Sequence, residues 1–138
     1  MLKQLTIFLE NKKGSLTEMT RLLSENSINI ISFTIAETSG YGLMRMIVDK
    51  PEEALKLLKE NTYSASLTDV LVVEISTNVG TLNKLIEKLE DFDIEYLYVY
   101  SNNDKISGIV LKINEQMIGE AIKVINDSGY NLVEDYCI

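Results

Sequence analysis

The residues with the clearest chemical potential are two glycines, Gly14 and Gly80, each placed where a strand-like run gives way to a helical one. The first N–H groups of a helix have no partner within the helix, and a residue that lacks Cβ lets an anion approach them closely. A carboxylate could therefore bind at either position without a basic side chain. A glycine in a plain turn explains the same residues equally well, so both interpretations stay open.

Short polar residues mark a second candidate position, at the start of a later strand in each half of the chain. Asn29 and Asp93 occupy matching places there, where their oxygens could accept hydrogen bonds from an ammonium group or could instead stabilise turns. The candidate ligand-binding residues are Asn11, Gly14, Ser15, Leu16, Asn29 and Ile30 in the first half, and Asn78, Gly80, Thr81, Leu82, Asp93 and Ile94 in the second.

Of the two glycines, Gly14 marks the better candidate for a carboxylate site. Ser15 begins a capping-box pattern, and the pair Lys12-Lys13 adds local positive charge, whereas Asp93 would disfavour a carboxylate in the second half. We expect Gly14→Val to abolish binding by steric exclusion, with the fold retained if φ at this residue is negative.

Two absences restrict the chemistry of the chain. It has no histidine, so it lacks the commonest general base near neutral pH and the commonest ligand for transition metals. Its single cysteine, Cys137, therefore has no imidazole to activate it and cannot form a disulfide within a monomer. The acidic groupings at 52–53, 87–91 and 134–135 are better explained as solvated faces than as paired catalytic carboxylates. We expect no enzyme activity, no metal and no cofactor.

The charge and hydropathy patterns exclude other classes of partner. A formal net charge of -8 repels phosphate backbones and anionic lipid surfaces. No apolar run approaches the ~20 residues that a membrane-spanning helix needs, and the N-terminus opens directly into a strand pattern without a signal-peptide core. We therefore expect a cytoplasmic protein that binds neither nucleic acid nor membranes.

Both halves of the chain show the same order of elements, βαββαβ. In the first half the hydrophobic pattern predicts strands at 2–9, 28–36, 43–49 and 63–67, with a helix after Gly14 and another from Pro51. In the second half it predicts strands at 70–76, 94–101, 107–113 and 130–137, with helices at 81–91 and 115–128. Asn114 is expected to cap the last helix and Gly129 to end it.

This repeat predicts two α+β domains, 1–68 and 69–138, each an antiparallel sheet with helices on one face. A core of ~65–70 residues is marginal, so the domains should stabilise one another. In the second domain, Tyr96, Tyr98 and Tyr100 share one face of a strand, where they could pack in a core or interface or stack on a ligand.

Several segments together resemble a known family. They are the Gly-Ser/Thr-Leu openings of the two first helices, the run Ser27-Ile28-Asn29-Ile30 entering a strand, the run Ile47-Val48-Asp49-Lys50-Pro51 entering a helix, and the stretch 94–100. Over essentially the whole chain, this pattern resembles that of small, stand-alone proteins with two tandem ACT domains.

The resemblance implies ferredoxin-like domains that pair, with a small amino-acid effector held between the first loop of one domain and a neighbouring second strand. The first loops differ from the family pattern Asp-x-Pro-Gly, since 11–14 and 77–80 lack both the acid and the proline. The glycine that is usual before the second strand is replaced by Ser27 and Asp91.

Two hypotheses for function lead from these observations. The first is a non-catalytic regulatory module that binds an amino-acid-like effector and acts through a homodimer or a partner enzyme. The second is a structural interaction subunit whose ligand sites have decayed, which would suit the altered first loops. An enzyme is the third and weakest, since no catalytic constellation accompanies the fold.

Overall fold

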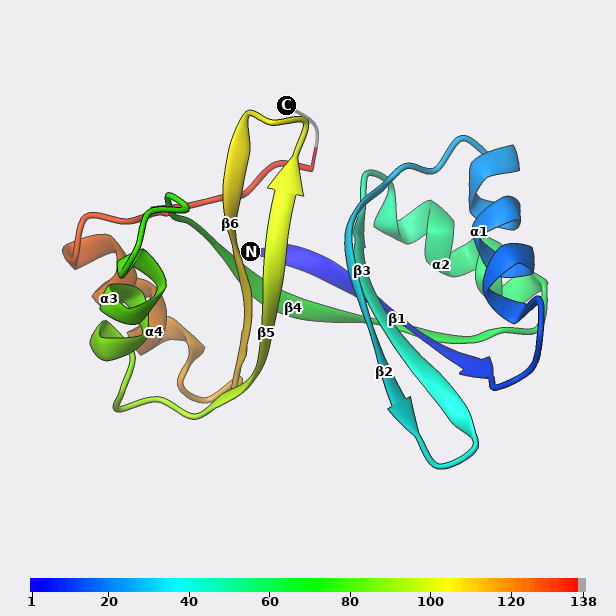
Figure 1. Ribbon diagram of the computed structural model, residues 1–138, viewed down its shortest axis with the longest axis horizontal. Helices are drawn as coiled ribbons and strands as arrows, with labels where there is room; N and C mark the ends of the chain where they lie inside the picture. The colour runs from blue at the N-terminus through cyan, green and yellow to red at the C-terminus, as the bar shows by residue number, and fades with distance from the viewer. Residues whose placement is uncertain (137–138) are drawn as a thin grey trace. The chain divides into compact units, whose positions relative to one another are not determined.

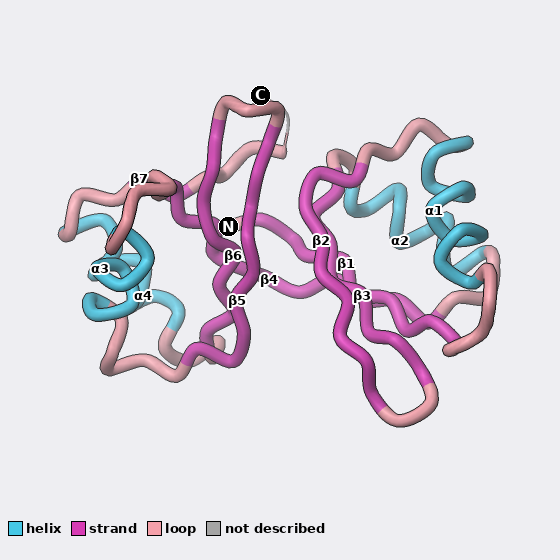
Figure 2. The backbone as a smooth tube through the Cα atoms, in the orientation of Figure 1, coloured by secondary structure: helices cyan, strands magenta, loops and turns pink. Residues whose placement is uncertain are grey.

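The computed structural model describes residues 1–136, which form four helices and seven strands (Figure 1). Contacts divide them into two compact units, an N-terminal unit of residues 3–68 and a C-terminal unit of residues 69–136 that also takes in Met1–Leu2. In each unit the helices lie on one side of the strands (Figure 2). Each unit therefore has the two-layer α+β architecture that the repeat predicted.

The N-terminal unit has the element order βαββαβ. Its elements are β1 (Leu2–Glu10), α1 (Ser15–Glu25), β2 (Ile30–Thr38), β3 (Tyr41–Val48), α2 (Pro51–Glu60) and the first part of β4 (Ser64–Glu74). The strand order is β2-β3-β1-β4, and β3 pairs antiparallel with both β1 and β2. This is the ferredoxin-like arrangement, and it places β2 at the edge of the sheet beside α1.

The C-terminal unit repeats this arrangement. It contains the rest of β4 together with α3 (Thr81–Lys88), β5 (Ile94–Asn102), β6 (Ile106–Ile113), α4 (Ile118–Asp127) and β7 (Asn131–Leu132). The strand order is β7-β4-β6-β5 with antiparallel pairs, so β5 lies at the edge as β2 does in the first unit. Both edge strands also carry a register irregularity near their start, between Ile30 and Ser32 and between Ile94 and Tyr96.

Each unit has its own apolar core between sheet and helices. In the first, Met19 and Leu23 of α1 and Leu58 of α2 pack on alternate residues of β1 and β3. In the second, Leu85 of α3 and Ile125 of α4 do the same against β4 and β6. The helical spacing of these residues and the period of two in the strands explain why the sequence predicted the order of helices and strands.

The separate strands predicted at 63–67 and 70–76 are in fact one strand, β4. The prediction placed a break at Thr68-Asp69, but neither residue forces a turn as glycine or proline would. The apolar run continues through 70–73, all buried, so the backbone stays extended. One strand thus supplies the last strand of the first unit and the first strand of the second.

Helix ends differ from prediction in three places, and the first is α3, which ends at Lys88 and not at residue 91. Ser15 does not cap α1, because Gly14 is the N-cap residue and no side chain caps this end, so the capping-box prediction is wrong. The last helix begins at Ile118, three residues later than predicted, since Asn114 first closes a turn with its Oδ1 accepting from the Gln116 N–H at 2.9 Å. It ends as predicted, at a left-handed Gly129 (φ 85°).

The C-terminal strand is shorter than predicted. β7 spans only Asn131–Leu132, although the Val133 N–H still donates to the Val72 carbonyl at 2.8 Å. The predicted strand extended to 137, and both its last residue and the expected isolated thiol of Cys137 lie outside the described residues.

Ser27 occupies the position before the second strand where a glycine is usual. It follows α1 with φ at 59°, the left-handed conformation that glycine adopts most readily. The Ser27 N–H donates to the Ser24 carbonyl, and the next N–H donates to Leu23, which closes the helix in a Schellman motif. The substitution therefore keeps the turn that leads into β2.

Candidate functional site

A groove between α1 and the edge strand β2 contains part of the predicted site. One section is a hollow of about 340 Å³. It is lined by Leu16, Thr17 and Thr20 of α1, by Ile30, Phe33 and Ile35 of β2, and by Met44 of β3. Two of the predicted residues, Leu16 and Ile30, therefore face the same space although they lie on different elements.

The walls of this hollow are apolar and open to solvent. Phe33 is 61% exposed, Ile35 46% and Leu16 43%. Scattered exposed apolar residues are ordinary, but three that converge on one hollow beside a sheet edge form a surface suited to an apolar ligand or a partner.

The first turn of α1 lies at this hollow with backbone donors available. The first helical hydrogen bond runs from the Glu18 N–H to the Gly14 carbonyl at 3.0 Å, so the N–H groups of Leu16 and Thr17 have no partner within the helix. Gly14 has φ 88°, a left-handed conformation that turns the chain from the loop into the helix. The fold of Gly14→Val was expected to be retained only if φ at this residue were negative. That condition is not met, because a valine would be strained at this φ.

The groove continues toward the start of β2 as a more polar hollow of about 420 Å³. Thr20 and Ile30 line both sections, and Asn29 lines the second. The Asn29 backbone is fixed by Asp49, whose Oδ1 accepts from the Asn29 N–H at 2.9 Å and whose N–H donates to the Asn29 carbonyl at 3.1 Å. The Asn29 backbone is therefore held in place at the end of the groove, and Asn29 is exposed to solvent.

The other predicted residues of the first unit lie elsewhere. Asn11 and Gly14 are exposed in the loop and line neither section of the groove. Ser15 faces a different hollow, on the opposite flank of α1. The positive charge expected from Lys12 is offset by Glu10, whose Oε2 is 3.4 Å from the Lys12 Nζ.

The C-terminal unit presents the same surface in matching places. Leu82 of α3 is 41% exposed, and Leu97 and Val99 of β5 are 39% and 67% exposed. Gly80 is again the helix N-cap, with φ 89°. The structure thus repeats one helix start and one apolar sheet edge in both units.

The remaining predicted residues of this unit belong to the loop and to the start of β5. Asn78 serves the loop, because its carbonyl accepts from the Thr81 N–H at 3.3 Å and from the Thr81 Oγ1 at 2.9 Å. Asp93 is exposed and Ile94 half-buried where β5 begins.

Sequence reasoning missed Thr17, Thr20, Phe33 and Ile35. The signal that could have found the last two is the pair of apolar residues at alternate positions of β2, matched by Leu97 and Val99 in β5. Apolar residues exposed on one face of an edge strand are normally covered by another segment or by a partner. Their exposure depends on β2 being the edge strand, which the order of strands decides.

Two of the three tyrosines of β5 are buried in packing, and Tyr96 is half-buried. Tyr98 and Tyr100 are buried, and the Asn102 Nδ2 donates to the Tyr100 hydroxyl at 3.3 Å. Of the two interpretations offered by the sequence, packing is the one that this burial supports.

Two further features bear on chemistry. Within residues 1–136 no cluster of three or more acidic, histidine or cysteine side chains is placed to hold a metal ion. None of the described helices combines the length and apolar character needed to cross a membrane.

Comparison with known proteins agrees with this fold. Protein BT0572 from Bacteroides thetaiotaomicron superposes with a TM-score of 0.88 at 35% identity, covering 98% of this chain and 93% of that one. The ligand-free regulatory subunit of aspartate kinase from Thermus thermophilus has a TM-score of 0.63 at 16% identity over 92% and 91% of the two chains, which shows a shared fold.

A shorter match links the chain to a protein with a known role. The acetolactate synthase small subunit of Haemophilus influenzae is 33% identical over 73 residues, which are 53% of this chain but only 45% of that subunit. Residues 1–136 as a whole match the family described as the ACT domain pair, and the chain belongs to that family.

Proposed function

We propose that the chain is a non-catalytic regulatory module that binds a small amino acid with an apolar side chain in the α1–β2 groove of its first unit. The observation that carries this proposal is the position of the Leu16 and Thr17 N–H groups, which have no partner within the helix, beside an apolar hollow. The effector carboxylate would accept from these N–H groups, and its side chain would enter the hollow.

The ammonium group of the effector is bonded to the same carbon as its carboxylate, and it would point toward Asn29. The side-chain oxygen of Asn29 can accept a hydrogen bond from an ammonium group, and Asp49 holds the Asn29 backbone in place. The apolar lining of the hollow favours aliphatic or aromatic side chains over charged ones, since burying an unpaired charge there would be costly.

Regulation would arise from the exposed edge strand. A neighbouring ACT domain, from a second copy or from a partner enzyme, would cover Phe33 and Ile35 and close the groove over the effector. An effector that binds the covered state more tightly shifts the equilibrium toward it, which is all that allosteric coupling requires. The similarity to a small subunit of acetolactate synthase favours an enzyme of amino-acid metabolism as the partner.

Calorimetry of the purified chain against valine, leucine, isoleucine, phenylalanine, aspartate and lysine tests the proposal. We expect an apolar amino acid to bind and aspartate not to bind. Leu16→Ala removes one wall of the hollow and should weaken binding about tenfold, which corresponds to about 1.4 kcal/mol. Leu82→Ala is the matched control, because Leu82 has the same place and similar exposure in the second unit.

Equal weakening by both variants would show that binding is not confined to the first unit. No heat from any of the apolar amino acids at millimolar concentration would contradict effector binding altogether. That outcome would favour the second candidate, an interaction subunit without a ligand, which the exposure of Phe33 and Ile35 supports independently. Sedimentation of wild type and Phe33→Glu would then test whether this edge holds copies together.

A further inference from the structure

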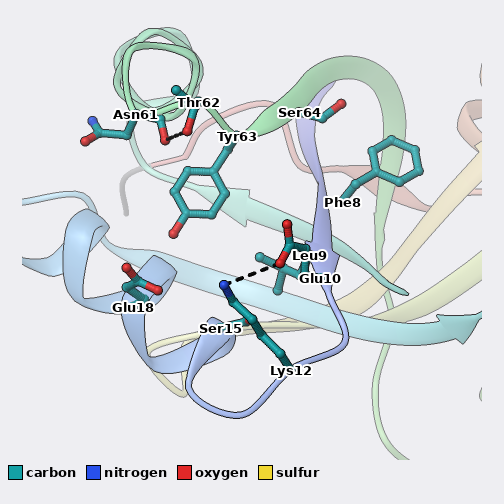
Figure 3. A pocket seen from close by; sticks show the side chains of 10 residues that line it. All are labelled: Phe8, Leu9, Glu10, Lys12, Ser15, Glu18, Asn61, Thr62, Tyr63 and Ser64. Atoms are coloured by element: carbon teal, nitrogen blue, oxygen red, sulfur yellow. Dashed lines mark hydrogen bonds and ion pairs between the residues drawn. The ribbon is translucent and has the colours of Figure 1, made fainter. Parts of the chain in front are cut away.

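A second hollow lies on the opposite flank of α1, and the proposed function does not use it. It measures about 380 Å³ and lies among the end of β1, the start of α1 and the turn between α2 and β4 (Figure 3). Its polar lining includes Glu10, Lys12, Ser15, Glu18 and Tyr63. This makes it chemically unlike the apolar section of the α1–β2 groove.

Tyr63 is held over this hollow by the way α2 ends. Thr62 has φ 67°, its N–H donates to Lys59 at 3.1 Å, and the Tyr63 N–H donates to Leu58 at 3.0 Å. Figure 3 shows the ring reaching toward α1 with its hydroxyl directed toward Glu18. Among residues 1–136 this hydroxyl has no hydrogen-bond partner.

Two hydroxyl oxygens in the hollow are available as acceptors. The Ser15 Oγ is buried and lacks any hydrogen-bond partner among the described residues, an arrangement that costs stability unless something else pairs with it. Burial raises the pKa of Tyr63, Glu18 raises it further and Lys12 opposes them. The phenol therefore stays neutral near pH 7, and its oxygen keeps the lone pairs that accept.

The charges of the hollow are unbalanced. Lys12 pairs with Glu10, at 3.4 Å, whereas Glu18 makes no ion pair with any described residue. An adjoining hollow of about 250 Å³ is also lined by Glu18, together with Arg21 and Glu25. The two hollows together are thus lined by three carboxylates and two cations, which leaves an excess of one negative charge beside the Tyr63 hydroxyl.

We propose that this hollow binds the protonated amino group of a small metabolite. The ammonium group would donate to the Glu18 carboxylate and to the hydroxyl oxygens of Tyr63 and Ser15. Three acceptors match its three N–H donors. The site is separate from the α1–β2 groove and holds or fails independently of the proposed function.

Lys12 allows a test of the sign of the ligand's charge. Its ammonium group repels a ligand cation but would attract a ligand carboxylate. Removing this charge should therefore strengthen the binding of an amine and weaken the binding of an acid. A nonspecific loss of structure would weaken both.

The experiment is calorimetry of the full chain with cadaverine, lysine and glutarate. Cadaverine carries two amino groups and no carboxylate, so it cannot use the N–H groups of α1; lysine carries both kinds of group, and glutarate only carboxylates. We expect the two amines to bind and glutarate not to bind. If cadaverine binds more tightly than lysine, the natural ligand is a polyamine, whereas the reverse order indicates an amino acid.

Variants locate the binding. Glu18→Gln should weaken cadaverine about tenfold or more, since it removes a charged acceptor, and Tyr63→Phe several-fold. Lys12→Gln should strengthen it several-fold. Glu52→Gln, an exposed glutamate of α2 that lines none of these hollows, is the matched control and should leave affinity unchanged. Thermal melts of each variant check that the fold is retained.

Three results would overturn the proposal. The first is tighter binding of glutarate than of cadaverine, and the second is weaker cadaverine binding in Lys12→Gln. The third is an equal effect of Glu18→Gln and Glu52→Gln, including the case in which the wild type binds neither amine at millimolar concentration.

Discussion

The loops that start α1 and α3 have the same backbone conformation. They differ in the hydrogen bonding of the side chain that follows the glycine. Gly14 and Gly80 have φ of 88° and 89°, and in both loops the first helical hydrogen bond returns to the glycine carbonyl at 3.0 Å. The Thr81 hydroxyl donates to carbonyls of its own loop, at 2.6 Å to Ser76, whereas the Ser15 hydroxyl is buried without a partner among the described residues. The backbone thus makes the turn in either case, and the side chains decide whether anything is left over for a ligand.

The largest expected difference between the units concerns Gly108 of β6 and Gly42 of β3. A Cβ on Gly108 would collide with the Val73 carbonyl oxygen in the neighbouring strand, whereas one on Gly42 would meet only the Ile35 Cγ2 at 3.8 Å. We expect Gly108→Ala to lower the free energy of unfolding by about 3 kcal/mol and Gly42→Ala to change it by less than about 0.5 kcal/mol. Urea unfolding of both variants measures this, and equal losses would mean that β4 and β6 are less closely paired than described.

The two helix-start glycines should respond alike. Both have a left-handed φ, and a Cβ at either position would meet no other atom within 4 Å, so only backbone strain opposes alanine. We expect Gly14→Ala and Gly80→Ala each to cost about 1–2 kcal/mol in unfolding free energy. Thermal unfolding compares them, and a loss confined to one loop would break the equivalence drawn from the backbone.

Alanine substitution of the residues that follow these glycines should affect stability differently in the two loops. Thr81→Ala deletes hydrogen bonds to two loop carbonyls and should cost about 1 kcal/mol. Ser15→Ala deletes a buried oxygen that has no partner among the described residues and should leave stability unchanged or raise it slightly. Denaturant titration of the two variants decides, and a comparable loss in Ser15→Ala would show that its hydroxyl is paired after all.

The smallest effect is confined to alkaline pH. The pKa of Tyr63 is raised above 10.0 in the folded protein by burial and by Glu18, so the folded state holds this proton more tightly than the unfolded state does. The resulting stability is present below about pH 10 and is lost as pH rises through the folded pKa. Between about pH 8 and pH 11, wild type should lose more unfolding free energy than Tyr63→Phe, and identical losses would contradict the shift.

Much of the fold could be predicted because each element signals itself locally. Leu85 and Leu89 recur at helical spacing, and Gly129 ends its helix as its freedom at positive φ suggests. The join between the units could not be predicted, since Thr68-Asp69 looks like a loop and becomes part of β4 once its neighbours pair. The capping role assigned to Ser15 failed for a related reason, because the helix boundary depends on the conformation of Gly14.

The candidate site was less accessible from sequence. Leu16 and Ile30 were identified, but Phe33 and Tyr63 were not, because their importance comes from what lies across the groove or hollow. Ser15 was predicted as a ligand-binding residue, and it lines the hollow on the flank of α1 that lies away from β2.

By itself the sequence determined the repeated βαββαβ order, the membership in an ACT-type fold and the lack of histidine chemistry. Periodicity, turn residues and composition are local properties of the chain, and they need no knowledge of which strands become neighbours. Only the tertiary structure decided that β2 and β5 form sheet edges, that α1 borders a hollow on each flank, and that Glu18 faces Tyr63. Those relations join residues far apart in sequence, and they exist only after the strands have been ordered and the helices packed.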